Sequence, residues 1–260
     1  MLVSIARLQE HREIWVAKPV LAAIYRVWFD ALLGTMPPGA RVLELGAGPG
    51  LLAEYACRTR PDLRWIASDI LLTPWNSLLA DGLRLPIRAG AVDVVAAVDF
   101  VHHLASPRML FEEASRVLVP NGHVTVVEPW VTPFSFFIYR YLHEEGCRPG
   151  LDPWNPFGAA RSVDKKPFEG DAAVPWRLVQ TTRAARWAEL GFAPPRVTIL
   201  NGFAYLASLG FRKASLAGAR VSAILRALDA SLTGLAPAVG VRAILRWERS
   251  IPEATRLIRS

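Results

Sequence analysis

The sequence has few cysteines and no long apolar run free of charge. Its two cysteines, Cys57 and Cys147, are too few for a disulfide framework, and no Cys/His spacing indicates a zinc site. No window of about 18 residues is apolar and uncharged, which argues against a membrane-spanning helix. Residues 1–15 lack the apolar stretch and the cleavage site of a signal peptide. We therefore expect a cytoplasmic protein.

A disordered chain is also excluded, because 52% of the 260 residues are hydrophobic and only 20% are charged. This length can bury a sizeable core and fits one large α/β domain. Low-complexity tracts and internal repeats are missing as well.

The net charge of +7 is concentrated near the C-terminal end. From Ser208 onward there are nine cations, namely Arg212, Lys213, Arg220, Arg226, Arg242, Arg246, Arg249, Arg256 and Arg259. The acids there are three, Asp229, Glu248 and Glu253, so the segment carries +6. Such a segment is either a solvated helical face or a contact with an anionic membrane. RNA is a more remote alternative partner.

Strand-like and helix-like segments alternate through the first half of the chain. Residues 1–34 have apolar residues at helical spacing. Strands are expected at 41–45, 63–67, 77–80, 92–98 and 124–128, with helices at 51–60 and 107–119. Alternation of this kind predicts parallel βαβ units in a doubly wound sheet. Ligands bind such sheets outside the carboxyl ends of the strands.

The second half is less regular. Residues 129–180 begin with an aromatic cluster and continue rich in proline and glycine, as in a lid or a binding loop. A helix is expected at 182–190. Asn201-Gly202 lies between two apolar runs, 196–200 and 203–207, which is a strong hairpin signal. We expect three parts: an N-terminal helical cap (1–38), an α/β domain (39–207) and a basic tail of two amphipathic helices (208–260).

A glycine-rich turn carries the chemistry. In the segment 42–50, VLELGAGPG, a strand is followed by a turn in which Gly46 and Gly48 let a ligand approach the backbone. Dinucleotide sites require G-x-G-x-x-G, but Leu51 occupies the third-glycine position here. Glu44 precedes the turn, where its charge would oppose a pyrophosphate and would suit the amino group of a methionine moiety.

Further polar residues stand where strands end. Asp69 ends the second strand, and a carboxylate there can accept both hydroxyls of a ribose. Asp81-Gly82 follows the third strand. Asp99 ends the fourth strand and is followed closely by His102 and His103. These side chains are expected to meet at one edge of the sheet.

This set of motifs resembles the class I S-adenosylmethionine-dependent methyltransferases, in particular the small-molecule subfamily called type 11. The resemblance rests on 42–50, Asp69, Asp81-Gly82, the run 92–104 and Pro120-Asn121-Gly122. It implies a mostly parallel seven-stranded sheet that ends in an antiparallel hairpin, with helical extensions at both ends. It also implies S-adenosylmethionine as the cofactor. In that family Glu44, Gly46 and Gly48 would line its methionine end, Asp69 would hold the ribose, Ile70 would pack on the adenine, Asp81 would take the adenine amino group, and Asp99 would lie by the methionine or the acceptor.

Methyl transfer to a hydroxyl group also needs alignment, exclusion of water and a proton acceptor. Histidine suits that role at neutral pH. The candidates are His102 and His103, after the fourth strand, and His143 in the insertion. Because adjacent residues point apart, at most one of His102 and His103 is expected to face the site. A structural role is an open alternative for each of the three.

The aromatic cluster of the insertion favours a small hydrophobic or aromatic acceptor, although core packing is an alternative explanation. An acceptor that partitions into membranes would agree with contact between the basic tail and an anionic membrane.

Two other functions stay open, a nicotinamide-dependent oxidoreductase and a noncatalytic binding protein. Nucleic acid is not expected as the acceptor, because the chain lacks an Asn/Asp-Pro-Pro-aromatic signature. The sequence leaves the methylated atom and the oligomeric state undetermined.

Overall fold

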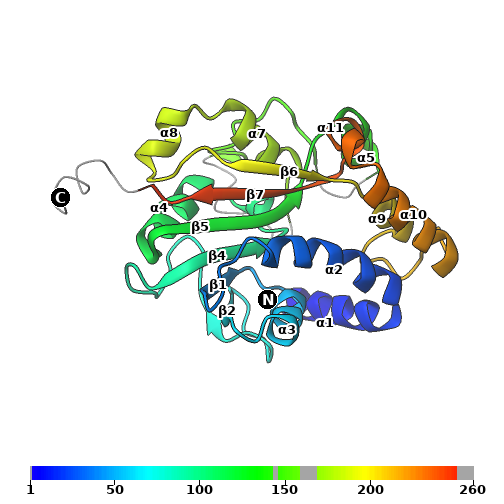
Figure 1. The fold of residues 1–260 in the computed structure, drawn as a ribbon, viewed down its shortest axis with the longest axis horizontal. Coiled ribbons are helices and arrows are strands. Elements are labelled where there is room, and N and C mark those ends of the chain that lie inside the picture. The colour runs from blue at the N-terminus through cyan, green and yellow to red at the C-terminus, as the bar shows by residue number, and fades with distance from the viewer. Residues whose placement is uncertain (1, 143–145, 159–168, 251–260) are drawn as a thin grey trace.

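A twisted sheet runs through the protein with helices on both faces (Figure 1). The computed structural model describes residues 2–142, 146–158 and 169–250. Within them the strands are β1 (Arg41–Leu45), β2 (Arg64–Asp69), β3 (Leu78–Leu79), β4 (Val92–Val98), β5 (Leu118–Pro129), β6 (Arg196–Leu200) and β7 (Arg242–Glu248). They form one seven-stranded sheet in the order β3-β2-β1-β4-β5-β7-β6. β7 is antiparallel to β5 and β6, and the other pairs are parallel. The expected fold class is confirmed.

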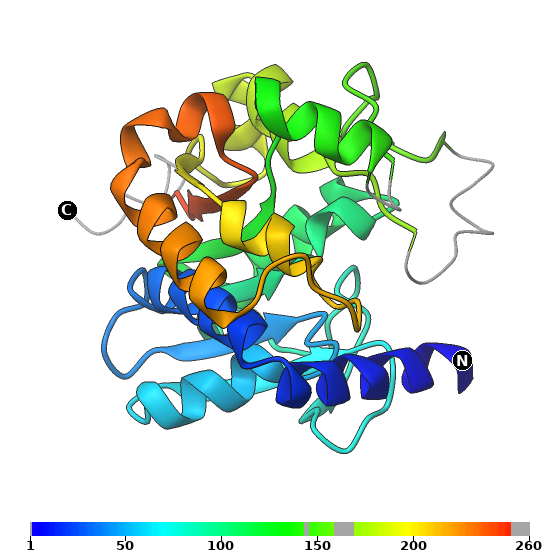
Figure 2. The same cartoon turned by 90° about the vertical axis from the view of Figure 1, so that its right-hand side faces the viewer.

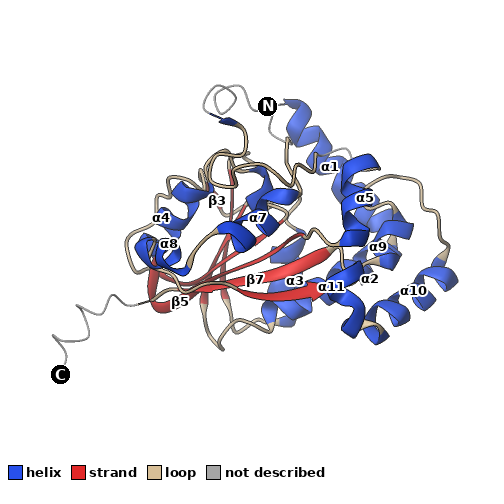
Figure 3. Cartoon of the chain, turned by 90° about the horizontal axis from the view of Figure 1, so that it is seen from above, coloured by secondary structure: helices blue, strands red, loops and turns tan. Residues whose placement is uncertain are grey.

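Helices connect and cover the strands. The α-helices are α1 (Leu2–Ala17), α2 (Pro19–Leu33), α3 (Leu51–Thr59), α4 (Pro107–Val117), α5 (Pro133–Tyr141), α7 (Ala173–Thr181), α8 (Ala184–Glu189), α9 (Phe203–Ser208), α10 (Ala219–Ser231) and α11 (Ala236–Val239). Two short 3₁₀ helices are η1 (Val101–His103) and η2 (Thr233–Leu235). Figure 3 shows α1, α5, α9 and α10 gathered at one end of the sheet. α5 and α9 directly follow the carboxyl ends of β5 and β6, so this is the end where a ligand is expected.

The two faces of the sheet are packed with large apolar side chains. On one face Phe111 of α4 contacts Trp187 of α8 and Trp247 of β7, with ring centroids 4.9 and 5.0 Å away. On the other face Phe29 and Leu32 of α2 are buried against the strands. Burial on both faces explains the near-continuous apolar runs of β1 and β4.

The expected hairpin has a different second strand. Residues 203–207 lie in α9 and not in a strand, and β6 pairs instead with β7 from the C-terminal segment. Asn201 does not close a two-residue turn, because its side-chain amide donates to the carbonyls of Asp229 and Leu232. The Asp229 carboxylate accepts the backbone N–H groups of Phe203 and Ala204, at 2.8 and 3.1 Å. These contacts provide acceptors for the free backbone N–H groups in the first turn of α9. The prediction of a hairpin between 196–200 and 203–207 was therefore wrong about its second strand.

The segment 208–260 is not a tail of two helices. Its first half contains α10 as expected, but residues 242–248 form β7 inside the sheet, and residues 251–260 lie outside the described residues. The insertion 129–180 is also more regular than expected. It contains α5 and α7, and α7 buries Val174 and Leu178 in the core. Residues 242–248 form a strand because they pair with β5 and β6, which are distant in the sequence. The local sequence of this segment does not show that pairing.

Candidate active site

The glycine turn after β1 adopts backbone angles that favour glycine. Gly46 and Gly48 have φ angles of 61° and 52°. A Cβ atom at Gly46 would lie 2.4 Å from the ring of Phe100, so no larger residue fits there. The backbone N–H of Gly48 donates to Asp69 at 2.8 Å. The turn is thus a preformed concave cradle with bare backbone facing a cavity.

Asp69 is fixed at the end of β2 as expected. Its carboxylate accepts the N–H groups of Gly48 and Leu71, at 2.8 and 2.9 Å, and the residue is buried. The next residue, Ile70, is 60% exposed and lines the same cavity. Asp69 therefore joins the two turns after β1 and β2, and Ile70 offers an apolar surface beside them.

Glu44 is buried beneath the turn and accepts a hydrogen bond from the indole N–H of Trp65 at 2.8 Å. Burial raises the pKa of Glu44 to about 8, the hydrogen bond from Trp65 opposes this rise, and the Asp69 charge adds to it. The carboxyl group is thus mostly protonated at neutral pH when no ligand is bound. Glu44 was expected from the sequence to be a charged carboxylate, and for the protein without a ligand this expectation is corrected.

Asp81 and Gly82 form the third turn of the site. The Asp81 carboxylate accepts the N–H of Leu83 at 2.9 Å, and both residues line the cavity. A Cβ atom at Gly82 would lie 2.8 Å from the Phe100 ring. Phe100 consequently packs between the turns after β1 and β3, and sequence reasoning had not singled it out.

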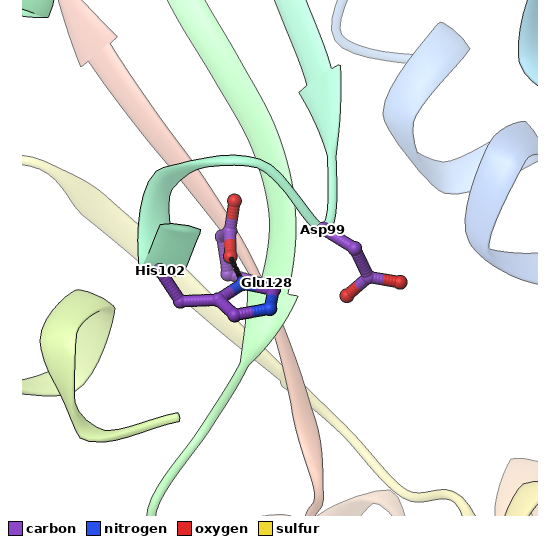
Figure 4. Close-up of side chains that lie close together, drawn as sticks. All are labelled: Asp99, His102 and Glu128. Carbon is purple, nitrogen blue, oxygen red and sulfur yellow. Dashed lines mark hydrogen bonds and ion pairs between the residues drawn. The ribbon is translucent and has the colours of Figure 1, made fainter. Parts of the chain in front are cut away.

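His102 is held by a buried glutamate. Its Nδ1 lies 2.6 Å from Oε2 of Glu128, at the end of β5 (Figure 4). The other oxygen of Glu128 accepts the N–H groups of Phe100 and Val101, at 2.9 and 2.6 Å. Glu128 therefore fixes both the histidine ring and the short helix η1 that carries it. In the sequence, Glu128 is the charged residue at the end of the apolar run 124–128. A charged residue in a buried strand needs a polar partner, and this could have pointed to a contact such as that with His102.

Both expected histidines of η1 line the cavity. They lie in a 3₁₀ helix, where successive residues do not alternate as they do in a strand, and His102 is buried whereas His103 is partly exposed. Their ring centroids lie 4.1 Å apart, and Nδ1 of His103 lies 3.1 Å from the carbonyl oxygen of Glu169. His143, the third candidate, lies outside the described residues.

An ion pair between Asp99 and Arg242 forms part of the cavity wall. Asp99, which has a φ of 53°, pairs with Arg242 at the start of β7. Arg242 also donates to the hydroxyl of Tyr205 at 3.1 Å, and its guanidinium lies over the ring of Trp28. Burial opposes the charge of Arg242, but Asp99 and the nearby tyrosines hold its pKa above the ordinary value. Asp99 is where the sequence places it, whereas Arg242 was missed.

Asp99, His102 and Glu128 also have the spacing of metal ligands, with one donor atom from each lying within 4.8 Å of the others. In the described part of the chain, however, His102 is bonded to Glu128 and Asp99 to Arg242. A cation bound here would have to displace the Arg242 guanidinium.

The cavity continues from these turns into an apolar chamber, and its whole volume is about 1860 Å³. The chamber walls come from α1, α5, α9 and the segment 209–216. Most of the lining is apolar and includes Leu8, Phe134, Ile138, Phe203, Phe211 and Leu216, whereas α1 and the segment 209–216 also contribute Arg7, Glu10, Arg212 and Lys213. A site for one small ligand takes roughly 300–1,000 Å³, so this cavity has room for two. All expected cofactor residues, from Glu44 to Asp99, lie along it.

The chain is similar to known methyltransferases. Residues 43–126 match the family model described as "Methyltransferase domain". An uncharacterized methyltransferase of Mycobacterium sp. (strain KMS) is 30% identical over 159 residues, which are 58% of this chain and 58% of that protein. The chain thus spans less than two thirds of the length of that relative. The family match ends within β5, so most of the apolar chamber is built from residues beyond it.

Two solved structures share the fold. A geranyl diphosphate C-methyltransferase from Streptomyces coelicolor A3(2), in complex with Mg²⁺, geranyl diphosphate and S-adenosyl-L-homocysteine, has a TM-score of 0.51 and 16% identity. The alignment covers 89% of this chain and 83% of that one. A SAM-dependent methyltransferase from Archaeoglobus fulgidus has a TM-score of 0.50 and 17% identity, over 86% and 94% of the two chains. At these identities the likeness concerns the fold alone.

Proposed function

We propose that this chain is a class I S-adenosylmethionine-dependent methyltransferase and that it methylates a small lipophilic acceptor. One observation carries the proposal: the polar turns after β1, β2 and β3 open into an apolar chamber within one cavity of about 1860 Å³. Two ligands of different chemistry fit side by side in such a space.

The turns fit the cofactor of this family. Gly46 and Gly48 themselves carry no side chain, so a ligand can approach the backbone of the cradle between Phe100 and Leu8, and Asp69 offers a carboxylate beside it. In our proposal Glu44, Gly46, Gly48 and Asp99 bind the methionine part, Asp69 the ribose, and Ile70, Asp81 and Gly82 the adenine. When bound, S-adenosylmethionine supplies the methyl group from its sulfonium.

His102 is the proton acceptor in this proposal. Its Nδ1 faces Glu128, which orients the ring and stabilises the imidazolium that forms when the ring takes a proton. A proton acceptor beside an apolar chamber suits an acceptor with a hydroxyl group. Glu128 is then a positioning residue, and His103 contributes to the wall. A lipophilic acceptor that fills the chamber would displace water from beside the cofactor, which favours displacement in a fixed alignment.

The acceptor is proposed to be hydrophobic or aromatic, because Phe134, Ile138, Phe203 and Phe211 line the chamber. Phe134 packs edge-on against Phe203, with ring centroids 5.7 Å apart, so α5 and α9 jointly shape the wall.

Contact with an anionic membrane is part of the proposal, since a lipophilic acceptor partitions into bilayers. We also place the enzyme in the cytoplasm, as a proposal that rests on the composition of the chain. No helix in the described residues is long and apolar enough to cross a membrane.

The test has two steps. Isothermal titration of the full chain with S-adenosylmethionine and, separately, NADH should give binding to the first compound alone. Radiolabelled S-adenosylmethionine is then incubated with the protein and a lipid extract of the source cells, and the labelled product is isolated. We expect label in an organic-soluble small molecule. Binding of NADH in preference to S-adenosylmethionine, or label found only in nucleic acid, would contradict the proposal.

A further inference from the structure

Exposed apolar side chains surround the mouth of the cavity. Leu142, just after α5, and Leu216, before α10, both line the cavity, yet they are 71% and 77% exposed. Phe137 and Tyr141 on the outer side of α5 are 62% and 69% exposed. Large apolar side chains clustered in this way usually mark a contact surface.

Helix α10 continues this surface. Val221, Ile224 and Leu228 are exposed at the spacing i, i+3, i+7, so they form one stripe. An adjacent side of α10 faces inward: Ser222 is buried, and the Asp229 carboxylate accepts backbone N–H groups of α9. Figure 2 looks onto this end of the molecule, where α10, α5 and α1 surround the segment 209–218. The stripe is therefore an unpartnered helix face beside the cavity mouth.

Cations accompany the apolar residues. Arg212, Lys213 and Arg220 are exposed, and Arg226 is partly exposed on α10. The one acidic residue between 209 and 231 is Asp229, which is engaged with the backbone of α9. Glu10 of α1 pairs with Lys213 at 3.2 Å, and this pair still leaves the segment positive. Apolar residues flanked by cations complement an anionic lipid surface.

We infer that this mouth surface, defined by Phe137, Tyr141, Leu142, Leu216, Val221, Ile224 and Leu228 with the exposed cations Arg212, Lys213 and Arg220, docks on an anionic lipid bilayer. The apolar residues enter the boundary of the acyl chains, and the cations contact the headgroups. A lipophilic acceptor then passes from the bilayer into the chamber without crossing water. The inference rests on the proposed function, because it assumes that the chamber takes a lipophilic acceptor.

The docking surface uses only the first half of the basic segment 208–260 that was expected from the sequence. Arg242 is buried on Asp99, and Arg246 and Arg249 lie on or beside β7, where Arg246 pairs with Glu248 at 3.4 Å. Arg249 donates to the carbonyl of Leu118. The cations near the end of the described chain therefore serve the sheet, whereas Arg212, Lys213 and Arg220 are exposed beside the cavity mouth.

The experiment is co-sedimentation of the full chain with vesicles of phosphatidylcholine alone or with about 30% phosphatidylglycerol. Wild type should bind the anionic vesicles, and binding should weaken between 50 and 500 mM salt by roughly tenfold or more. The variant Ile224→Glu/Leu228→Glu should lose at least about tenfold in vesicle affinity. Met109→Glu, on the exposed side of α4 away from α10, is the matched control and should bind as wild type does.

Two readouts separate folding and function from docking. Each variant is titrated with S-adenosylmethionine, and equal affinity shows that the fold and the cofactor site are intact. If wild type fails to bind S-adenosylmethionine, the proposed function fails, whatever the vesicles show. If it binds the cofactor but no anionic vesicle, or if Ile224→Glu/Leu228→Glu sediments as wild type does, the docking inference is overturned. A stable dimer that is lost in the same variant would overturn it too, in favour of a second copy of the chain.

Discussion

Two buried glutamates of this site differ in how their oxygens are bonded. Glu128 accepts two backbone N–H groups and faces Nδ1 of His102. Glu44 has the indole N–H of Trp65 as its donor and lies near the Asp69 carboxylate, and its burial raises its pKa. Glu128 therefore positions its neighbours, whereas Glu44 lies where a cationic ligand group would offset the cost of burying its charge.

Cofactor binding should release a proton from Glu44. Burial raises the pKa of Glu44 to about 8, so below that pH the free protein holds this proton, and the cationic amino group of a ligand favours its loss. We expect affinity for S-adenosylmethionine to rise with pH between 6 and 8, by up to about tenfold per unit. Titration calorimetry in buffers of different ionisation enthalpy should show nearly one proton released at pH 7.

Glu44→Gln keeps the shape of the side chain and removes the titration. Its proton release at pH 7 should fall toward zero, and its affinity should change little between pH 6 and 8. An unchanged proton release in this variant would assign the effect to another group.

His102→Ala should lower the turnover number by about 10²- to 10⁴-fold, because the proton acceptor is lost. Glu128→Gln should lower it less and should shift the pH profile, since the amide still accepts the backbone N–H groups but no longer stabilises an imidazolium. The rates are measured on the labelled acceptor. His103→Ala is the matched control, and a loss as large as that of His102→Ala would reassign the role.

At the scale of elements, one lysine organises a wall of the chamber. The ammonium of Lys18, between α1 and α2, has three N–H groups that are shared among four carbonyl oxygens: those of Gly210, Arg212 and Ala214, each at 2.9 Å, and that of Ser208. Ser208 ends α9, and the other three carbonyls belong to the segment after α9, which contains no regular structure of its own up to α10. A single charged group thus holds an irregular wall in place.

Lys18→Met should loosen this wall. The carbonyls lose a charged donor, and we expect a loss of about 1–3 kcal/mol in the free energy of unfolding. Hydrogen exchange should quicken in residues 209–216 and stay unchanged in β4. Lys213→Met, which removes an exposed lysine of the same segment, is the control and should have little effect. Equal exchange in wild type and Lys18→Met would show that the wall does not depend on Lys18.

At the scale of the whole molecule, the last strand completes both the core and the site. β7 lies between β5 and β6, brings Trp247 against Phe111 and Trp187, and places Arg242 beside Asp99. The segment beyond residue 208 therefore contributes a strand to the α/β unit, although it was expected as a separate helical tail. Its removal would expose two strand edges as well as the buried ion pair.

Trp247→Ala should destabilise the whole molecule by about 3–5 kcal/mol, because it leaves a large cavity in the core. Urea unfolding followed by circular dichroism and by cofactor binding should give one coincident transition at a lower midpoint. Leu228→Ala on the exposed stripe of α10 is the control, with an expected change below about 0.5 kcal/mol. Two separate transitions in Trp247→Ala would instead indicate that residues 208–260 unfold on their own.

The sequence by itself determined the strands β1 and β4, the glycine turn at Gly46 and the acidic residues at the strand ends. Apolar runs and glycine-requiring angles are local properties that the residues carry with them. Only the tertiary structure decided that β6 pairs with β7, that Glu128 holds His102, and that Asp99 meets Arg242, which is 143 residues away along the chain. Such contacts depend on how distant segments pack against each other, and local periodicity carries no record of that packing.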